Sequence, residues 1–315
     1  MKVRASAGRP VLPVVYLAET DSGRKIEFVE SFQLPLRGPK KWVLAVSVLA
    51  GCPVHCLICD AGLLYLGRLS RDEILAQIDF LVNRRFPGGR VSLDEVEVQF
   101  SRMGEPAFNP AVLDVLEALP ARYDAPGLAP TVCTMAPAST DRFFDRLLEI
   151  KNAFFPGGRF QLQFSIHTTD TNLRNRLIPV KKWDFGRIAR YGGKFHAPGD
   201  RKIALNFVLS GGIPVEPEVL SHHFDPAVFR LRMTPLSATH EAARHGFTSL
   251  IGPHQVDAAL GLIEKLSALG YEITVGLGDA EENRIGSNPG QSLMKHLQVA
   301  TPLDSGYSYP LQPFS

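Results

Sequence analysis

The sequence lacks a long apolar run, an excess of either charge and a dispersed set of cysteines. Its 315 residues carry a formal net charge of +2 and only four cysteines. No run approaches the ~18 apolar residues of a membrane span, so no transmembrane helix is expected. A net charge this small gives no strong signature of nucleic-acid binding, although it leaves RNA binding open. Without dispersed cysteines, we expect no framework of disulfide bonds.

The amino terminus also lacks the apolar core segment of a secretory signal. Bunched thiols suit a reducing compartment better than an oxidising one. We therefore expect a cytoplasmic protein with no membrane partner. With 45% hydrophobic and 21% charged residues, the composition is that of an ordinary globular protein. The chain is long enough for one large α/β barrel or two modest domains.

Apolar, β-rich stretches recur along the chain, with helical stretches between them. The predicted strands are Trp42–Ala50, Val96–Phe100, Pro130–Thr134, Phe160–Ile166, Ile203–Leu209, Val228–Met233 and Tyr271–Val275. A capping box from Ser70 to Glu73 predicts the start of a helix over Ile74–Phe86. A second amphipathic helix is predicted over Pro253–Leu269, before Gly270. Alternation of this kind predicts a parallel sheet.

Six or so β/α units after a short N-terminal segment predict a partial (β/α)6 barrel of the TIM type. We expect a small N-terminal β extension at 1–41, the barrel at 42–275 and a C-terminal tail or lid at 276–315. Within the extension, Lys25–Phe32 and Gln33–Leu36 are possible strands. The chemistry of such barrels lies at the carboxyl ends of the strands.

Three of the four cysteines, Cys52, Cys56 and Cys59, fall within eight residues directly after the first barrel strand. This spacing can hold three irons of a [4Fe-4S] cluster and leave the fourth iron open to a small molecule. A zinc site with His55 as the fourth ligand is an alternative, although four ligands so close together would strain the loop. A purely structural group of thiols is the third interpretation.

The cysteine spacing resembles that of the radical S-adenosylmethionine (radical SAM) superfamily. The segment Phe100–Asn109, which contains Met-Gly-Glu-Pro, resembles a signature of the large-subunit rRNA adenine methyltransferases within that superfamily. Phe164–Pro179 resembles the same family's Ser-Leu-His-Ala segment. Weaker similarity runs from about Gly23 to Leu293. The resemblance implies that the three clustered cysteines bind a [4Fe-4S] cluster and that SAM binds its open iron.

The resemblance also implies a set of residues around SAM. Glu105 would pair with the ammonium group of SAM, as charge-assisted hydrogen bonds favour. The complete set is Gly104, Glu105, Thr134, Ser165, His167 and Ser237, the last standing where the family has Asn. Taken singly, Glu105 could be a solvated carboxylate, and Ser165 and His167 could be polar groups at a strand end. Their order on successive strand ends favours a binding site.

The sequence departs from the family's pattern at several positions. Two cysteines that the family uses for methyl transfer are replaced by Ala45 and Pro289, neither of which can carry a methyl group. The remaining thiol, Cys133, is expected to face the core or lie beside the cofactor. Arg102 stands where the family has a small residue. It would either bind an anionic substrate or be a solvated loop residue.

The resemblance therefore implies an enzyme that reductively cleaves SAM to a 5′-deoxyadenosyl radical, which abstracts hydrogen from an unidentified small-molecule or nucleotide substrate. An electron donor such as flavodoxin or ferredoxin is implied as a partner. Methyl transfer to RNA by a modified mechanism is an alternative, disfavoured by the missing cysteines and by the short segment before the barrel. A non-catalytic metal-binding or cluster-binding protein is a third interpretation.

Overall fold

Seven parallel strands form one side of a large sheet, beginning at its edge. The computed structural model describes residues 1–9, 12–33, 40–249, 257–276, 285–298 and 310–314. The sheet has the strand order β12-β11-β10-β9-β8-β7-β4-β3-β2-β1-β13. Its parallel strands are β4 (Lys41–Val46), β7 (Glu95–Phe100), β8 (Leu128–Thr134), β9 (Gln161–Ser165), β10 (Ile203–Leu209), β11 (Phe229–Pro235) and β12 (Ile273–Val275). The predicted α/β fold with a parallel sheet is confirmed.

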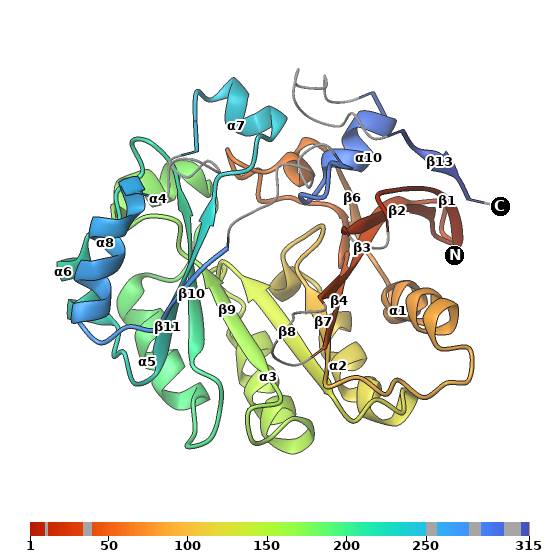
Figure 1. Ribbon diagram of the computed structural model, residues 1–315, viewed down its shortest axis with the longest axis horizontal. Helices are drawn as coiled ribbons and strands as arrows, with labels where there is room; N and C mark the ends of the chain where they lie inside the picture. The colour runs from red at the N-terminus through yellow and green to blue at the C-terminus, as the bar shows by residue number, and fades with distance from the viewer. Residues whose placement is uncertain (10–11, 34–39, 250–256, 277–284, 299–309, 315) are drawn as a thin grey trace.

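Helices follow the strands, and most of them cover the outer side of the curved sheet, whereas those at His240–Arg244 and Gln291–His296 lie beyond the strands at one end of it (Figure 1). The helices are α1 (Arg71–Arg85), α2 (Ala111–Arg122), α3 (Asp141–Phe154), α4 (Thr171–Leu177), α5 (Phe185–Phe195), α6 (Pro217–His223), α7 (His240–Arg244), α8 (Asp257–Ala268) and α10 (Gln291–His296). The predicted capping box is confirmed, because the Ser70 side chain accepts from the Glu73 amide and the Glu73 carboxylate accepts from the Ser70 amide. The helix predicted over Pro253–Leu269 is observed as α8, and residues 253–256 lie outside the described residues. None of the helices in the described ranges is long and apolar enough to cross a membrane.

The predicted strand Trp42–Ala50 is divided into β4 and β5 (Leu49–Gly51). The division has a physical cause at Ser47, whose hydroxyl donates to the Glu27 carbonyl at 2.5 Å and whose amide donates to Gln77 Oε1 at 2.9 Å. These bonds take Ser47 out of the strand ladder. The chain then turns into a separate antiparallel hairpin of β5 and β6 (Tyr65–Arg68), which carries the cysteine loop.

The N-terminal strands extend the same sheet in antiparallel fashion. They are β1 (Lys2–Ala7), β2 (Val14–Glu19) and β3 (Lys25–Gln33), and β13 (Gln312–Pro313) pairs with β1. The strand predicted over Lys25–Phe32 is confirmed as β3, whereas 34–36 lies outside the described residues. The first two strands were not predicted. In β1, alternating small and polar residues carry little β signal, whereas the apolar run of β2 carries a β signal that the sequence analysis missed.

Alternation along the strands separates a core face from a cavity face. On β9, Phe164 is fully buried in the core under α3 and α5, where its ring lies 6.4 Å from Phe144 and 6.4 Å from Tyr191. Its neighbours Gln163 and Ser165 point to the inner side of the sheet and line a cavity. The core therefore fixes which side chains reach the site.

Candidate functional site

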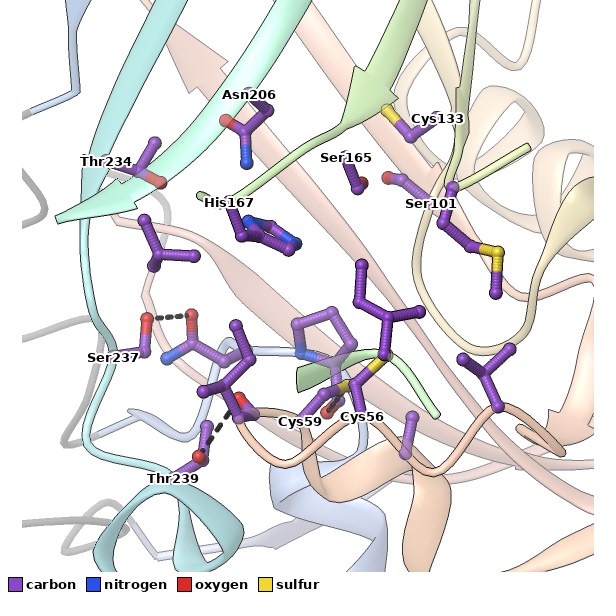
Figure 2. Close-up of a pocket in the computed structure, with 18 of the residues that line it drawn as sticks. Cys56, Cys59, Ser101, Cys133, Ser165, His167, Asn206, Thr234, Ser237 and Thr239 are labelled. Atoms are coloured by element: carbon purple, nitrogen blue, oxygen red, sulfur yellow. Dashed lines mark hydrogen bonds between the residues drawn. The ribbon is translucent and has the colours of Figure 1, made fainter. Parts of the chain in front are cut away.

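A cavity of about 590 Å³ lies on the inner side of the sheet, at the carboxyl ends of the parallel strands. The three clustered cysteines line it, together with five of the residues predicted to surround SAM: Gly104, Glu105, Ser165, His167 and Ser237. Figure 2 shows Cys56 and Cys59 on one side of the cavity and Cys133 and Asn206 on the other. The predicted site residues are thus brought together from separate strands.

The cysteine loop runs between β5 and a short 3-10 helix, η1 (Asp60–Leu63). Gly51 begins the loop with φ of +84°, and a Cβ there would lie 1.7 Å from the Leu64 carbonyl oxygen. Only glycine permits this close approach. The Leu57 amide donates to the Leu177 carbonyl at 3.0 Å, which fastens the loop to α4. The Cys59 Sγ donates to the Pro289 carbonyl at 3.7 Å.

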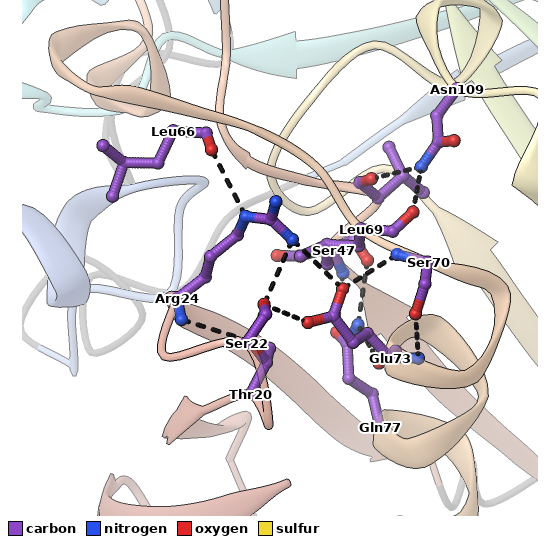
Figure 3. Close-up of polar contacts among 11 residues, drawn as sticks. Thr20, Ser22, Arg24, Ser47, Leu66, Leu69, Ser70, Glu73, Gln77 and Asn109 are labelled. Carbon is purple, nitrogen blue, oxygen red and sulfur yellow. Dashed lines mark hydrogen bonds and ion pairs between the residues drawn. The ribbon is translucent and has the colours of Figure 1, made fainter.

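A polar network ties the hairpin of β5 and β6 to the rest of the molecule (Figure 3). Asn109 Nδ2 donates to the carbonyl oxygens of Val48 at 2.7 Å and Leu69 at 2.8 Å, which directly precede β5 and directly follow β6 at the open end of the hairpin. Arg24 Nε donates to the Leu66 carbonyl at 3.3 Å. The hairpin that carries the cysteines is therefore held by side chains from outside it.

The position of His55 does not support a zinc site with four ligands from the cysteine loop. All three cysteines line the cavity, whereas His55 does not, and its Nδ1 lies 2.6 Å from the Gly62 carbonyl oxygen. In the described part of the chain, no three or more His, Cys, Asp or Glu side chains are grouped so that they could hold one ion. Cluster ligation does not need such convergence, because each thiolate binds a different iron.

Burial and neighbouring charges keep these thiols protonated without metal. Burial raises the pKa of Cys52 to about 12 and that of Cys59 to about 11. For Cys56, burial raises the pKa well above its ordinary value, and the neighbouring Cys59 and Cys52 raise it further. A negative charge on one of these thiols would therefore disfavour a negative charge on the next. Metal binding would release their protons and relieve this cost.

Glu105 is a buried carboxylate that meets only neutral donors. Its Oε1 accepts from Thr134 Oγ1 at 2.5 Å and from the Ala107 amide at 3.0 Å, and its Oε2 accepts from the Met135 amide at 2.9 Å. Burial raises its pKa to about 7, and no cation among the described residues offsets this effect. The carboxylate therefore suits an ammonium group supplied by a ligand. Thr134, which was predicted to line the cofactor site, is not among the residues that line the cavity, and its hydroxyl donates to Glu105.

Gly104 sets the position of Glu105 beside the cysteine hairpin. Its φ is +97°, and a Cβ there would lie 2.4 Å from Cγ of Leu49 on β5. The preceding carbonyl, on Met103, accepts from the amides of Val48 at 2.9 Å and Leu49 at 3.1 Å. Because no other residue tolerates both this backbone conformation and this contact, the close packing of the two loops requires glycine.

His167 and Ser237 complete the predicted set. His167 adopts a left-handed backbone with φ of 66°, and its buried Nδ1 has no hydrogen-bond partner among the described residues. Burial, and to a lesser degree Arg174, lowers the pKa of His167 to about 4, so the ring is neutral near pH 7. An unpartnered buried nitrogen at a cavity wall fits a polar ligand. Ser237 Oγ donates to Asn288 Oδ1 at 2.7 Å.

Arg102 is placed differently from the solvated position considered above. It is 4% exposed, and its Nη2 lies 2.6 Å from the Glu27 carboxylate. Its guanidinium also donates to the carbonyl oxygens of Gly286, at 3.4 Å, and Ser287. The interpretation as a solvated loop residue is wrong, because the buried Glu27 draws the guanidinium inward. Although Arg102 lines the cavity, its charge is already compensated.

The other departures from the family pattern lie at separate places. Ala45 lies opposite Val29 across the β3–β4 ladder, packs against the apolar cluster that contains Val29, and does not line the cavity. Pro289 does line it, beside Cys59. Cys133 faces the cavity rather than the core, where Gln163 Nε2 donates to its Sγ at 3.4 Å and burial raises its pKa to about 12.

Several cavity residues were not singled out from the sequence. They are Gln99, Ser101, Gln163, Asn206, Arg232 and Thr234. The available signal was polar residues at alternate positions of otherwise apolar strands, as in Gln161–Ser165 and Phe229–Pro235. In a barrel this pattern marks the side chains that face inward.

The fold is similar to that of a solved radical SAM enzyme. A solved radical SAM methyltransferase from Sphaerobacter thermophilus matches with a TM-score of 0.65 and 22% identity, over 89% of this chain and 77% of that one. Curated relatives include a probable dual-specificity RNA methyltransferase RlmN of Parasynechococcus marenigrum, 28% identical over 64% of this chain and 56% of its own length. A probable RNA methyltransferase of Ectopseudomonas mendocina is 32% identical over 59% of this chain and 49% of its own length.

These comparisons confirm the resemblance drawn from the sequence motifs. The chain spans about half the length of the curated relatives that it matches, from 49% to 56% of the two described above. No protein-family model matches it. The similarity therefore shows a shared fold and a partial likeness to RNA methyltransferases.

Proposed function

We propose that this chain is a radical SAM enzyme that holds a [4Fe-4S] cluster on Cys52, Cys56 and Cys59 and binds SAM beside it. One observation carries the proposal: three half-buried thiols share a cavity with Glu105, a carboxylate that has no cationic partner among the described residues. When bound, the cluster and SAM supply a 5′-deoxyadenosyl radical for hydrogen abstraction from a substrate.

The residues of the chain bind and orient in this proposal. Glu105 accepts the ammonium group of SAM, and the Thr134 hydroxyl and Met135 amide hold its two oxygens in place. Neutral His167 offers its free Nδ1 as a hydrogen-bonding atom. Apolar side chains close the remaining wall and keep water from the reacting atoms: Val54, Ile58, Ile178, Val208 and Leu236.

The substrate in this proposal is a small molecule or a nucleotide, and the electron comes from a flavodoxin or ferredoxin. Methyl transfer to RNA is the second candidate, because the curated relatives carry that activity in their names. It is less favoured, since Ala45 and Pro289 stand where the methyltransferase family has its two additional cysteines. Cys133 is the one other thiol in the sequence, and it lines the cavity from β8, at neither of these two positions.

The deciding experiment is anaerobic reconstitution followed by incubation with SAM and dithionite, with nucleoside products quantified by mass spectrometry. We expect 5′-deoxyadenosine from the wild type and none from the variant in which the three clustered cysteines are alanine. Cys133→Ala is the matched control for cluster assembly, and it should keep its iron and its cluster absorption. Absence of a cluster from the wild type would overturn the proposal.

The same assay separates the second candidate. Formation of S-adenosylhomocysteine, together with transfer of a labelled methyl group from SAM to RNA, would favour methyl transfer. Zinc at one equivalent with no iron, in protein purified without air, would favour the non-catalytic metal-binding alternative.

A further inference from the structure

The charges that line the cavity do not balance within the described residues. Three charged side chains line it: Arg102, Glu105 and Arg232. The charge of Arg102 is compensated by Glu27, whose Oε1 lies 2.6 Å from Arg102 Nη2. Glu105 has no cationic partner among the described residues. Among the described residues, no carboxylate forms an ion pair with Arg232. Its guanidinium contacts a neutral amide, with Nη1 donating to Gln163 Oε1 at 3.4 Å.

The carboxylates deeper in the barrel do not need Arg232. Glu97 pairs with Lys41 and accepts from Thr131 Oγ1 at 2.5 Å. Glu95 lies 3.4 Å from Lys41 Nζ and 2.8 Å from Arg201 Nη1. The inward-facing acidic groups of this layer are therefore already satisfied. These contacts therefore give no support to a role for Arg232 in compensating the charges of Glu95 and Glu97.

Arg230, two residues earlier on β11, provides a comparison. Its Nη2 donates to Gln161 Oε1 at 3.0 Å, as Arg232 does to Gln163. Arg230 does not line the cavity, whereas Arg232 does. The same strand thus presents two arginines to the inner side of the sheet, and only the one nearer the cysteines reaches the space where a substrate would lie.

Strand register places hydrogen-bonding groups beside Arg232. Asn206 on β10 is its partner across the parallel ladder, and Ser165 on β9 is the partner of Asn206 on the other side. All three line the cavity. Figure 2 shows Ser165, Asn206 and Thr234 across the cavity from Cys56 and Cys59. A guanidinium flanked by neutral donors forms a floor suited to oxygen atoms that carry negative charge.

We propose that Arg232, together with Asn206, binds a carboxylate or phosphate group of the substrate and so orients the substrate with its other end toward the cysteine loop. This inference rests on the proposed function in one respect, namely that the cavity receives a substrate. A guanidinium that has no carboxylate partner in the described part of the chain is costly in a partly buried site, and an anionic group satisfies it with two parallel hydrogen bonds. The substrate is therefore an acid or a phosphate ester rather than a neutral molecule.

The test is a binding titration of the reconstituted protein with two probes, inorganic phosphate and acetate. Binding is followed by the line widths of the ³¹P and ¹³C resonances. Saturating SAM is present without reductant, so that any anion site belonging to SAM is filled. Arg232→Gln is compared with Arg230→Gln, which removes the same charge outside the cavity, and with Arg232→Lys. Circular dichroism confirms that each variant folds.

We expect saturable binding of at least one probe to the wild type. Loss of a charged hydrogen bond should weaken it at least about tenfold in Arg232→Gln, with a smaller loss in Arg232→Lys and a change within about twofold in Arg230→Gln. Binding of phosphate alone identifies a phosphate ester, and binding of acetate identifies a carboxylic acid. If neither probe binds the wild type, or if Arg232→Gln binds as the wild type does, the proposal is wrong.

The two proposals fail independently. Arg232-dependent anion binding without SAM cleavage would leave the anion site intact and remove the radical SAM assignment. Formation of 5′-deoxyadenosine without Arg232-dependent anion binding would support the radical SAM assignment and remove the anion site.

Discussion

At the scale of single residues, Glu105 shows how burial prepares a side chain for a ligand. The carboxylate is 5% exposed and accepts three hydrogen bonds, yet burial still raises its pKa to about 7. Neutral donors offset only part of the cost of desolvating a charge. A cationic group that enters the cavity can offset the rest of this desolvation cost.

Replacing Glu105 by Gln should therefore weaken SAM binding. The side chain keeps its shape and loses its charge, and a hydrogen bond to a charged group contributes about 1.5–3 kcal/mol, which corresponds to a roughly ten- to hundredfold rise in Kd. Equilibrium dialysis of the reconstituted protein with labelled SAM measures it. Glu97→Gln, which removes a buried carboxylate outside the cavity, should leave the Kd within about twofold. Equal effects of the two substitutions would contradict this role.

The same carboxylate makes stability depend on pH. The folded protein holds its proton up to a pKa of about 7, whereas the unfolded chain releases it near the ordinary value of 4.5. The free energy of unfolding of the ligand-free protein should therefore fall as pH rises through this interval. The rise in pKa corresponds to about 3 kcal/mol.

Urea denaturation of metal-free wild type and Glu105→Gln at pH 5 and pH 8 measures this effect. Other titrating groups, including the cysteines, are common to both proteins and cancel in the difference. We expect the stability of the wild type relative to Glu105→Gln to be lower at pH 8 by about 2–3 kcal/mol. Parallel pH profiles would contradict the burial effect.

At the scale of elements, helix α1 and the cysteine hairpin support each other. Ser70 is both the N-cap of α1 and the residue that follows Leu69, whose carbonyl accepts from Asn109. Glu73 accepts from Ser22 and pairs with Arg24 at 3.4 Å, and Arg24 in turn contacts the hairpin. The N-terminal strands thus reach the hairpin through the first turn of α1.

Removal of the cap should measure this support. Ser70→Ala loses the hydrogen bond to the Glu73 amide and should lower the free energy of unfolding by about 1 kcal/mol. Glu216→Ala is the matched control, because Glu216 is the N-cap of α6 and makes no side-chain cap bond. It should change stability by less than about 0.5 kcal/mol. Urea denaturation checks both, and equal losses would contradict the cap.

At the scale of the whole molecule, a buried ion pair joins three parts of the chain. Glu27 lies on β3, Arg102 follows β7, and both hold the residues around α10. Glu27 accepts from the amides of Gly290 at 2.6 Å and Leu293 at 2.7 Å. Pro289 lies in the chain between Ser287, which contacts Arg102, and Gly290, which contacts Glu27. Its carbonyl oxygen accepts from Cys59 Sγ. The pair therefore sets one wall of the cavity.

Breaking the pair should loosen that wall. Arg102→Met leaves Glu27 buried without its cation, and loss of one partner of a buried pair costs about 3–5 kcal/mol. Hydrogen exchange at the Gly290 and Leu293 amides should speed up along with the loss of stability. Arg122→Met breaks an exposed pair with Asp79 and should cost less than about 1 kcal/mol, without changing exchange at these amides. Unchanged exchange in Arg102→Met would contradict the coupling.

The sequence by itself determined the parallel sheet, the β3 strand, the α1 cap and the grouping of the three cysteines. These features depend on local patterns, such as apolar runs, a Ser-x-x-Glu box and cysteine spacing, which are visible without long-range contacts. Only the tertiary structure decided the partners of residues far apart in the chain. Arg102 could not be assigned without Glu27, 75 positions away. Arg232 could not be recognised until the register of three strands set it beside Asn206 in the cavity, because the surroundings of a charge are fixed by packing between strands.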